Sequence, residues 1–112
     1  MHAERFELPA ETATAFRESR SEVARVCVGT TSLRVVESVF AGRSQSTDIF
    51  IHPGNPPKHA NALITNFHWP KSTLMVLVCT FGGHALVQRA YREAVAARYR
   101  FASYGDAMLL VK

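Results

Sequence analysis

Hydroxyl-bearing side chains gather in two short segments, each of which follows an apolar run and precedes a helical pattern. Residues 29–34 read Gly-Thr-Thr-Ser-Leu-Arg, and residues 65–73 read Thr-Asn-Phe-His-Trp-Pro-Lys-Ser-Thr. Free backbone N–H groups at a helix N-terminus favour an anion or a carboxylate. Ser and Thr at such positions can alternatively be plain helix caps. Two such turns in one short chain favour a shared pocket.

Several side chains in or beside these segments could bind a ligand or carry a proton. Arg34 could clamp a carboxylate or phosphate, or it could be a solvated helix charge. Glu37, one turn later, could simply pair with Arg34. His68 stands in a polar loop beside Asn66 and Lys71, where a histidine can serve acid–base chemistry or merely lie on the surface. We retain Arg34 and His68 as site candidates.

The elements that must position these residues alternate between strand and helix patterns. Strands are predicted over residues 25–28, 47–51, 62–65 and 107–111, and helices from Pro9, over 33–40, over 74–81 and over 85–98. This order predicts an α/β fold with a parallel or mixed sheet flanked by helices. Ligands of such folds bind outside the carboxyl ends of the strands, where both segments are expected.

The last of these helices carries an apolar face. We expect that face to be buried against the sheet; it comprises Leu86, Val87, Ala90, Tyr91, Ala94 and Val95.

Length and composition narrow the class of protein. The chain has 112 residues, of which 47% are hydrophobic and 20% charged, as expected for one globular α/β domain over residues 1–112. Its net charge of +4 is compatible with a polyanionic partner such as RNA but is only weak evidence for one. No apolar run is long enough to cross a membrane or to follow a signal-peptide pattern, so we expect a cytoplasmic protein without membrane contact.

The two cysteines predict no metal site. Cys27 and Cys79 both stand in apolar stretches, as buried free thiols do, and a disulfide is the less favoured alternative. Neither cysteine has a partner at metal-ligand spacing, and the five histidines are scattered.

Four segments resemble motifs of the S-adenosylmethionine:tRNA ribosyltransferase-isomerase family of queuosine biosynthesis, in the family's order. The motifs are G-T-T-S-x-R-x-x-E-S at residues 29–38, T-D-I-F-I-Y-P-G at 47–54, A-L-I-T-N-F-H-L-P-K-S-T-L at 62–74 and Y-R-F-F-S-Y-G-D-A-M-L at 99–109. The resemblance covers only the last third of a usual member, which pairs an α/β domain with an inserted β-barrel. It therefore implies a C-terminal fragment of the catalytic domain that lacks the barrel.

The chain departs from these motifs at four positions. His52 stands in place of tyrosine, Asn61 in place of aspartate, Trp69 in place of leucine, and Ala102 in place of a second phenylalanine. Asparagine cannot carry the charge of aspartate, so the polar contacts around Asn61 are expected to differ.

The resemblance implies a reaction and assigns residues to it. The family moves the ribosyl part of S-adenosylmethionine onto 7-aminomethyl-7-deazaguanine in tRNA, which gives epoxyqueuosine; S-adenosylmethionine is a substrate, and no metal or further cofactor is implied. A general base and a group that protonates the departing adenine are needed. The catalytic candidates are His68, Lys71 and Asp106. The substrate-binding candidates are Thr30, Thr31, Ser32, Arg34, Glu37, Thr65, Asn66, Ser72, Thr73 and Tyr104.

Two other interpretations stay open. The chain could be a binding module for tRNA or a nucleoside without turnover, or a degenerate remnant whose open strand edges aggregate. Whether a separate polypeptide supplies the missing N-terminal region is also open.

Overall fold

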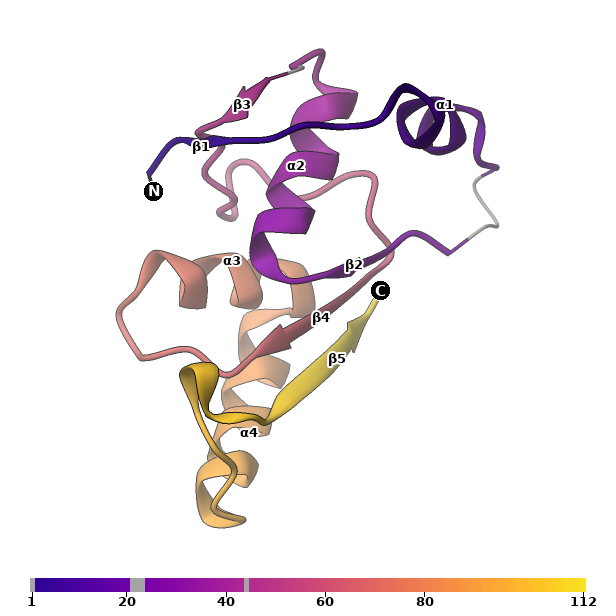
Figure 1. The fold of residues 1–112 in the computed structure, drawn as a ribbon. Helices are drawn as coiled ribbons and strands as arrows, with labels where there is room; N and C mark the ends of the chain where they lie inside the picture. Colours follow the sequence, from indigo (N-terminus) through magenta and orange to yellow (C-terminus); the bar gives the residue numbers. More distant parts are fainter. Residues whose placement is uncertain (1, 21–23, 44) are drawn as a thin grey trace.

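The computed structural model describes residues 2–20, 24–43 and 45–112. Within these ranges, the strands are β1 (Glu4–Arg5), β2 (Val26–Val28), β3 (Ser46–Thr47), β4 (Ala62–Asn66) and β5 (Ala107–Val111). The helices are α1 (Ala10–Glu18), α2 (Thr30–Phe40), α3 (Thr73–Gly82), α4 (His84–Ala96) and the short 3₁₀ helix η1 (Ala102–Tyr104) (Figure 1).

The central sheet has three strands in the order β2-β4-β5. β2 runs parallel to β4, with Cys27 opposite Leu63, and β4 runs antiparallel to β5, with Leu63 opposite Leu110. Helix α2 connects the two parallel strands, as such a pairing requires a crossover. The prediction of a mixed sheet with helices packed against it is therefore confirmed.

The predicted strand over residues 47–51 was wrong. Only Ser46–Thr47 form a strand, β3, and it pairs antiparallel with β1 in a separate two-stranded sheet. Beyond it, backbone groups bond to side chains instead of a neighbouring strand. The Ile49 N–H donates to the Thr47 hydroxyl (3.2 Å), and the Ile49 carbonyl accepts from the Arg34 guanidinium (3.0 Å).

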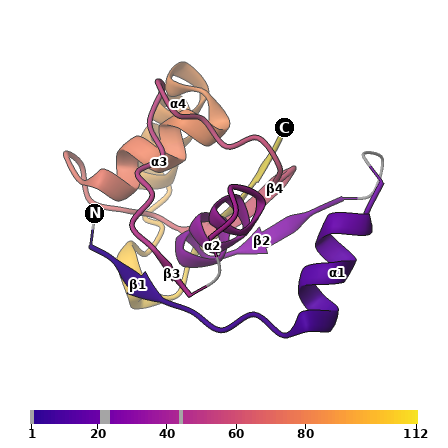
Figure 2. The ribbon, with the colours of Figure 1, turned by 90° about the horizontal axis from the view of Figure 1, so that it is seen from above.

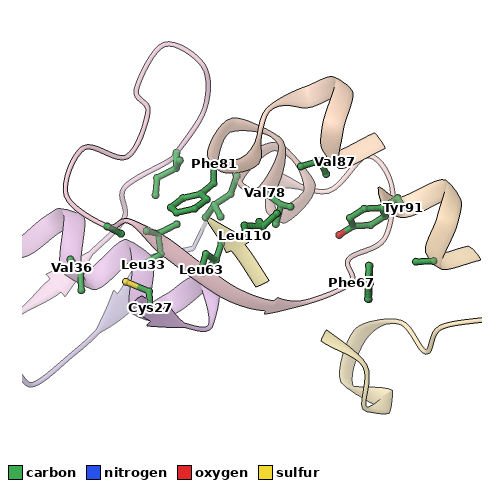
Figure 3. Close-up of a cluster of buried hydrophobic side chains, with 14 residues drawn as sticks. Cys27, Leu33, Val36, Leu63, Phe67, Val78, Phe81, Val87, Tyr91 and Leu110 are labelled. Atoms are coloured by element: carbon green, nitrogen blue, oxygen red, sulfur yellow. The ribbon is translucent and has the colours of Figure 1, made fainter. Parts of the chain in front are cut away.

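The hydrophobic core lies on one face of the central sheet. Cys27, Leu63 and Leu110 project from neighbouring strands toward this face, and all three are buried. Side chains of three helices meet them there (Figure 3), namely Leu33 and Val36 of α2, Val78 and Phe81 of α3, and Val87 of α4. Helices α2, α3 and α4 thus cover the same face.

The predicted apolar face of α4 is only partly buried. Val87, Tyr91 and Ala94 are buried, whereas Leu86 and Val95 are exposed. The buried residues follow the i, i+4, i+7 spacing of a single narrow stripe, and a helix that contacts one neighbouring surface can bury little more than that. Helix α1 lies at the opposite side of the molecule from α3 and α4 (Figure 2); none of its residues is fully buried, and its partly buried Phe16 packs against the core.

Helices α3 and α4 meet without an intervening loop. Gly83, with a φ of +89°, is the cap residue of both helices, a backbone conformation that favours glycine. At the neighbouring Gly82, a Cβ atom would lie 2.8 Å from Val87 and 3.0 Å from Leu110. The junction is therefore packed to the limit that glycine allows.

The buried thiol of Cys27 predicts a loss of stability in alkali. Burial, with a smaller effect of the Glu37 carboxylate, raises the Cys27 pKa from 9.0 to about 11. As the pH rises, the thiol of the unfolded chain loses its proton before the thiol of the folded chain does. The free energy of unfolding should therefore fall between pH 9.0 and about 11, and Cys27 should cause no change of stability with pH below that window. Urea unfolding of the wild type and of Cys27→Val across this window measures the effect. An equal decline in both proteins would contradict it.

Candidate functional site

A pocket opens at the carboxyl ends of β2 and β4, and we call it the strand-end pocket. Its volume is about 370 Å³. Its lining comprises Val28, Gly29, Thr30, Thr31, Ser32, Ile64, Thr65, Asn66, His68 and Ala107. The two hydroxyl-bearing segments therefore converge, as the sequence predicted.

The first wall of this pocket is the N-terminus of α2. Gly29 has a φ of +95°, and its N–H donates to the Ile64 carbonyl (2.8 Å), which ties the turn after β2 to β4. Among the described residues, no side chain caps α2 by a hydrogen bond. Its first backbone N–H groups, at Thr30, Thr31 and Ser32, are thus placed to receive an anionic group, aided by the helix dipole.

The second wall carries His68. Its Nε2 atom lies 2.8 Å from the Thr65 hydroxyl, and its backbone N–H donates to the Tyr91 hydroxyl (2.9 Å). Burial lowers the pKa of His68 below its ordinary value of 6.5. The imidazole is therefore neutral near pH 7 and able to accept a proton.

A smaller hollow adjoins the strand-end pocket, and Asn66 and His68 line both. It has a volume of about 280 Å³, and its other lining residues are Trp69, Ser72, Leu74, Ala102 and Ser103. The exposed Trp69 ring stacks on Phe101 with a centroid distance of 6.0 Å. The small Ala102 side chain, where the motif has phenylalanine, leaves this hollow beside an aromatic surface suited to stacking.

Arg34 lies outside the strand-end pocket, so the geometry does not support its predicted contact with substrate. Its buried guanidinium donates to the carbonyls of Ile49 and His2 (both 3.0 Å) and to the Glu4 carboxylate (3.2 Å). Arg34 thereby fastens the N-terminal segment and the chain beyond β3 to α2.

Glu37 also lies outside the pocket and is not paired with Arg34. Its carboxylate accepts the backbone N–H groups of Lys58 (2.5 Å), His59 (3.0 Å) and Ala60 (3.0 Å). These residues lead directly into β4. Glu37 therefore fixes the approach to β4 rather than a ligand.

Three further candidates, Lys71, Ser72 and Thr73, lie at the end of the loop between β4 and α3 and at the start of α3. Lys71 and Ser72 line an apolar groove of about 540 Å³, with Pro53, Pro56, Met75, Val76, Cys79, Thr80, His84 and Gln88. Ser72 also caps α3 by accepting the Met75 N–H (3.1 Å); the sequence allowed either Ser72 or Thr73 as this cap. Thr73 is exposed and lines neither the strand-end pocket nor its adjoining hollow.

The two candidates before β5 also lie outside the pocket. The Asp106 carboxylate accepts the Arg100 N–H (2.5 Å), and its backbone carbonyl accepts from the Asn66 amide (3.0 Å). Tyr104 is exposed. Asp106 therefore holds the pocket residue Asn66 in place, and of the three catalytic candidates only His68 lines the pocket.

Two motif departures perform structural tasks. The Asn61 side-chain oxygen accepts the Arg25 N–H (2.7 Å), and its backbone carbonyl accepts the Lys112 N–H (2.9 Å). These bonds join the chain beside β2, β4 and β5, and they need an acceptor but no charge. His52 accepts the Gly54 N–H at Nδ1 (3.1 Å) within its own turn.

Three lining residues lie outside the two hydroxyl-bearing segments that the sequence singled out: Val28, Ile64 and Ala107. They are apolar strand residues without reactive groups. The alternation of side chains between the two faces of a strand could have identified Ile64, because it lies two residues before the pocket residue Asn66 and so projects from the same face of the sheet.

Neither a metal cluster nor a membrane span is found in the described part of the chain. No group of three or more His, Cys, Asp or Glu side chains there could hold a metal ion. No helix there is long and apolar enough to cross a bilayer.

Fold and pocket together define an α/β domain with a candidate site at the carboxyl ends of its parallel strands. The chain belongs to the queuosine biosynthesis protein family, whose family model matches residues 1–110. The resemblance noted in the sequence is thereby confirmed.

Proteins named S-adenosylmethionine:tRNA ribosyltransferase-isomerase are similar to the whole chain. The protein of Anaeromyxobacter sp. (strain Fw109-5) is 50% identical and that of Azoarcus sp. (strain BH72) 51% identical over 118 residues, which cover 100% of this chain. The crystal structure of the S-adenosylmethionine tRNA ribosyltransferase of Thermotoga maritima superposes with a TM-score of 0.81 at 48% identity, over 92% of this chain and 39% of that one. The chain spans only 34% of the length of these curated relatives.

Proposed function

We propose that this chain supplies the strand-end pocket of an S-adenosylmethionine:tRNA ribosyltransferase-isomerase. The reaction would move the ribosyl part of S-adenosylmethionine onto 7-aminomethyl-7-deazaguanine in tRNA, with release of methionine and adenine, and give epoxyqueuosine. The names of the relatives support the reaction class. A cytoplasmic location, where tRNA is modified, follows from the proposal.

The observation that carries this proposal is the convergence of an uncapped helix N-terminus and a neutral histidine in one pocket. The first N–H groups of α2, with the hydroxyls of Thr30, Thr31 and Ser32, would bind the carboxylate of the methionine part. These groups bind an anion without a formal positive charge, so they repel the positive sulfonium of the substrate less than a cationic side chain would.

His68 would act as the general base at the reacting centre. Burial keeps its imidazole neutral, and the bond to the Thr65 hydroxyl holds the ring in one orientation. The adjoining hollow would receive a planar base against Trp69, since aromatic rings stack on bases irrespective of hydrogen bonding. Lys71 and Asp106 are not given catalytic roles in this proposal, because neither lines the pocket.

An adenine-release assay tests the proposal. The chain is incubated with S-adenosylmethionine and tRNA that carries 7-aminomethyl-7-deazaguanine, with and without the part of the Anaeromyxobacter relative that lies outside the matched region. We expect adenine release and a modified tRNA when both parts are present. The full-length relative is the positive control, and its activity together with no release from the combined parts would contradict the proposal.

A second candidate function is binding without turnover. It is favoured by the short span of the chain, 34% of its relatives' length, because groups needed for turnover could lie in the remainder. Salt-sensitive binding of the tRNA, with no adenine released in the combined assay, would support this alternative.

A further inference from the structure

The loop that carries His68 has no regular structure of its own. β4 ends at Asn66 and α3 begins at Thr73, and the residues between them belong to neither a helix nor a strand. The partly buried His68 N–H therefore has no partner in a helix or a sheet ladder, and such a group needs another acceptor. The residue that supplies this acceptor fixes the place of His68 in the pocket.

The acceptor is the hydroxyl of Tyr91, which reaches the loop from α4. The His68 N–H donates to this hydroxyl at 2.9 Å. Tyr91 is buried, and burial raises its pKa above the ordinary value of 10.0, so the hydroxyl is neutral near pH 7. No residue of α4, which the structure describes throughout, lines the strand-end pocket or its adjoining hollow. Tyr91 thus acts on the site from an element outside it.

Aromatic packing holds the Tyr91 ring in place. The ring lies edge-on to Phe67, with a centroid distance of 5.3 Å, and edge-on to Phe101 at 5.8 Å. Phe67 in turn stacks on Phe101 at 5.3 Å. Figure 3 shows Tyr91 and Phe67 next to each other in the buried cluster. Because Phe67 directly precedes His68, ring packing and the hydroxyl fix two consecutive residues of the loop.

The bond to Tyr91 complements the bond to Thr65. The Thr65 hydroxyl lies 2.8 Å from Nε2 and holds the imidazole, whereas the Tyr91 hydroxyl holds the backbone of the same residue. A shift of the backbone would turn the ring even if the bond to Thr65 remained. A displacement of about 1 Å can lower a reaction rate by about 100-fold.

We propose that Tyr91 is a positioning residue of the strand-end pocket, whose hydroxyl fixes the backbone at His68 and thereby orients the imidazole toward the reacting centre. The inference rests on the proposed function, which makes His68 the general base. Tyr91 touches no substrate in this arrangement and acts through His68 alone. A residue that merely stabilised the fold would leave the properties of His68 in the folded chain unchanged.

The surroundings of His68 make its own protonation a suitable probe. Burial is the cause that lowers its pKa below 6.5, and the hydroxyls of Thr65 and Tyr91 that contact it are uncharged near pH 7. On the side of β5, the Asp106 carboxylate accepts the Arg100 N–H. A loop released from Tyr91 would expose the imidazole, and its pKa would then rise toward 6.5.

An NMR titration of His68 in the 112-residue chain tests the positioning without any reaction. Tyr91→Phe keeps the packed ring and removes the acceptor, so the midpoint of His68 should rise toward 6.5. Tyr99→Phe is the matched control, because Tyr99 also contacts Phe67 edge-on (5.7 Å) but is 50% exposed. It should leave the midpoint at the wild-type value. An unchanged midpoint in Tyr91→Phe would overturn the inference.

A further variant separates positioning from stability. Val87 lies one turn before Tyr91 on the buried stripe of α4. Val87→Ala opens a cavity in the core and should lower the melting temperature more than Tyr91→Phe does, yet leave the midpoint of His68 unchanged. A midpoint that follows the melting temperature in both variants would also overturn the inference.

The kinetics of adenine release supply the second test. In the chain assembled with the part of the Anaeromyxobacter relative outside the matched region, Tyr91→Phe should lower kcat by about 10-fold and leave KM for S-adenosylmethionine within about twofold. Tyr99→Phe should change neither constant.

The two proposals fail in different ways. A midpoint that Tyr91→Phe shifts, with no adenine released by the wild-type assembly, would refute the proposed reaction and leave Tyr91 as the residue that fixes His68. Adenine release by the wild type that Tyr91→Phe does not slow would refute the inference about Tyr91 alone.

Discussion

Replacing Glu37 by alanine should lower the free energy of unfolding by about 3 kcal/mol, since a buried donor left without an acceptor costs about 1–3 kcal/mol, and one of its three donors is buried and two are partly buried. The Glu37 carboxylate holds three consecutive backbone N–H groups, those of Lys58, His59 and Ala60. Helix propensity opposes this loss, because alanine is the better helix former. Urea unfolding followed by circular dichroism measures the change.

Two further variants separate this cause from a general effect of mutation. Glu37→Gln keeps one acceptor oxygen and should lose less stability than Glu37→Ala. Glu93→Ala, on the exposed face of α4, should change the free energy of unfolding by less than about 0.5 kcal/mol. Equal losses in Glu37→Ala and Glu93→Ala would show that the three backbone bonds contribute nothing.

Replacing His68 by alanine should reduce the rate of adenine release by about 100- to 10,000-fold, the range expected for loss of a general base. The reason is its position: His68 is the one catalytic candidate that lines the strand-end pocket. The measurement is the rate of adenine release by the chain assembled with the part of the Anaeromyxobacter relative that lies outside the matched region. His84→Ala, at an exposed histidine in the apolar groove, is the matched control and should retain activity.

The pH dependence of the same rate tests the protonation state of His68. Burial lowers its pKa below 6.5, and only the neutral ring can accept a proton. Activity should therefore rise with pH through a midpoint below 6.5 and be lost as the pH falls through it. A midpoint above 6.5 would exclude His68 as the base.

The strand-end pocket could be predicted from sequence because its cause is local. Short apolar runs end at residues 28 and 64, and the hydroxyl-bearing segments follow them at once. The parallel pairing of β2 with β4 then brings both turns to one edge of the sheet. The cap at Ser72 was predictable for the same reason, since one hydroxyl and one helix start suffice.

The roles of Arg34 and Glu37 depended on distant segments and could not be predicted in this way. Arg34 donates hydrogen bonds to carbonyl groups near the N-terminus and beyond β3. Glu37 accepts hydrogen bonds from backbone N–H groups that lie 21 to 23 residues further along the chain. Neither segment carries a strong signal, because β1 and β3 are two residues long and residues 58–60 form no regular element. A side chain that bonds to irregular backbone leaves no periodic pattern.

The exposed positions of α4 illustrate a second limit. Leu86 and Val95 are apolar, and the sequence alone assigns them to the buried face. Which stripe of a helix faces the sheet depends on its rotation, and here the contacts of Val87 and Tyr91 with the core decide it.

The junction of α3 and α4 at Gly82 and Gly83 limits how far the width of the apolar groove can change. With Val87 and Leu110 pressed against Gly82, the two helices cannot part without breaking the core, so they form a stiff floor. The groove is lined on its other side by Pro53 and Pro56, and neither residue belongs to a helix or to a strand. A change in the width of the groove would therefore have to come from that turn, because core packing fixes the helical side.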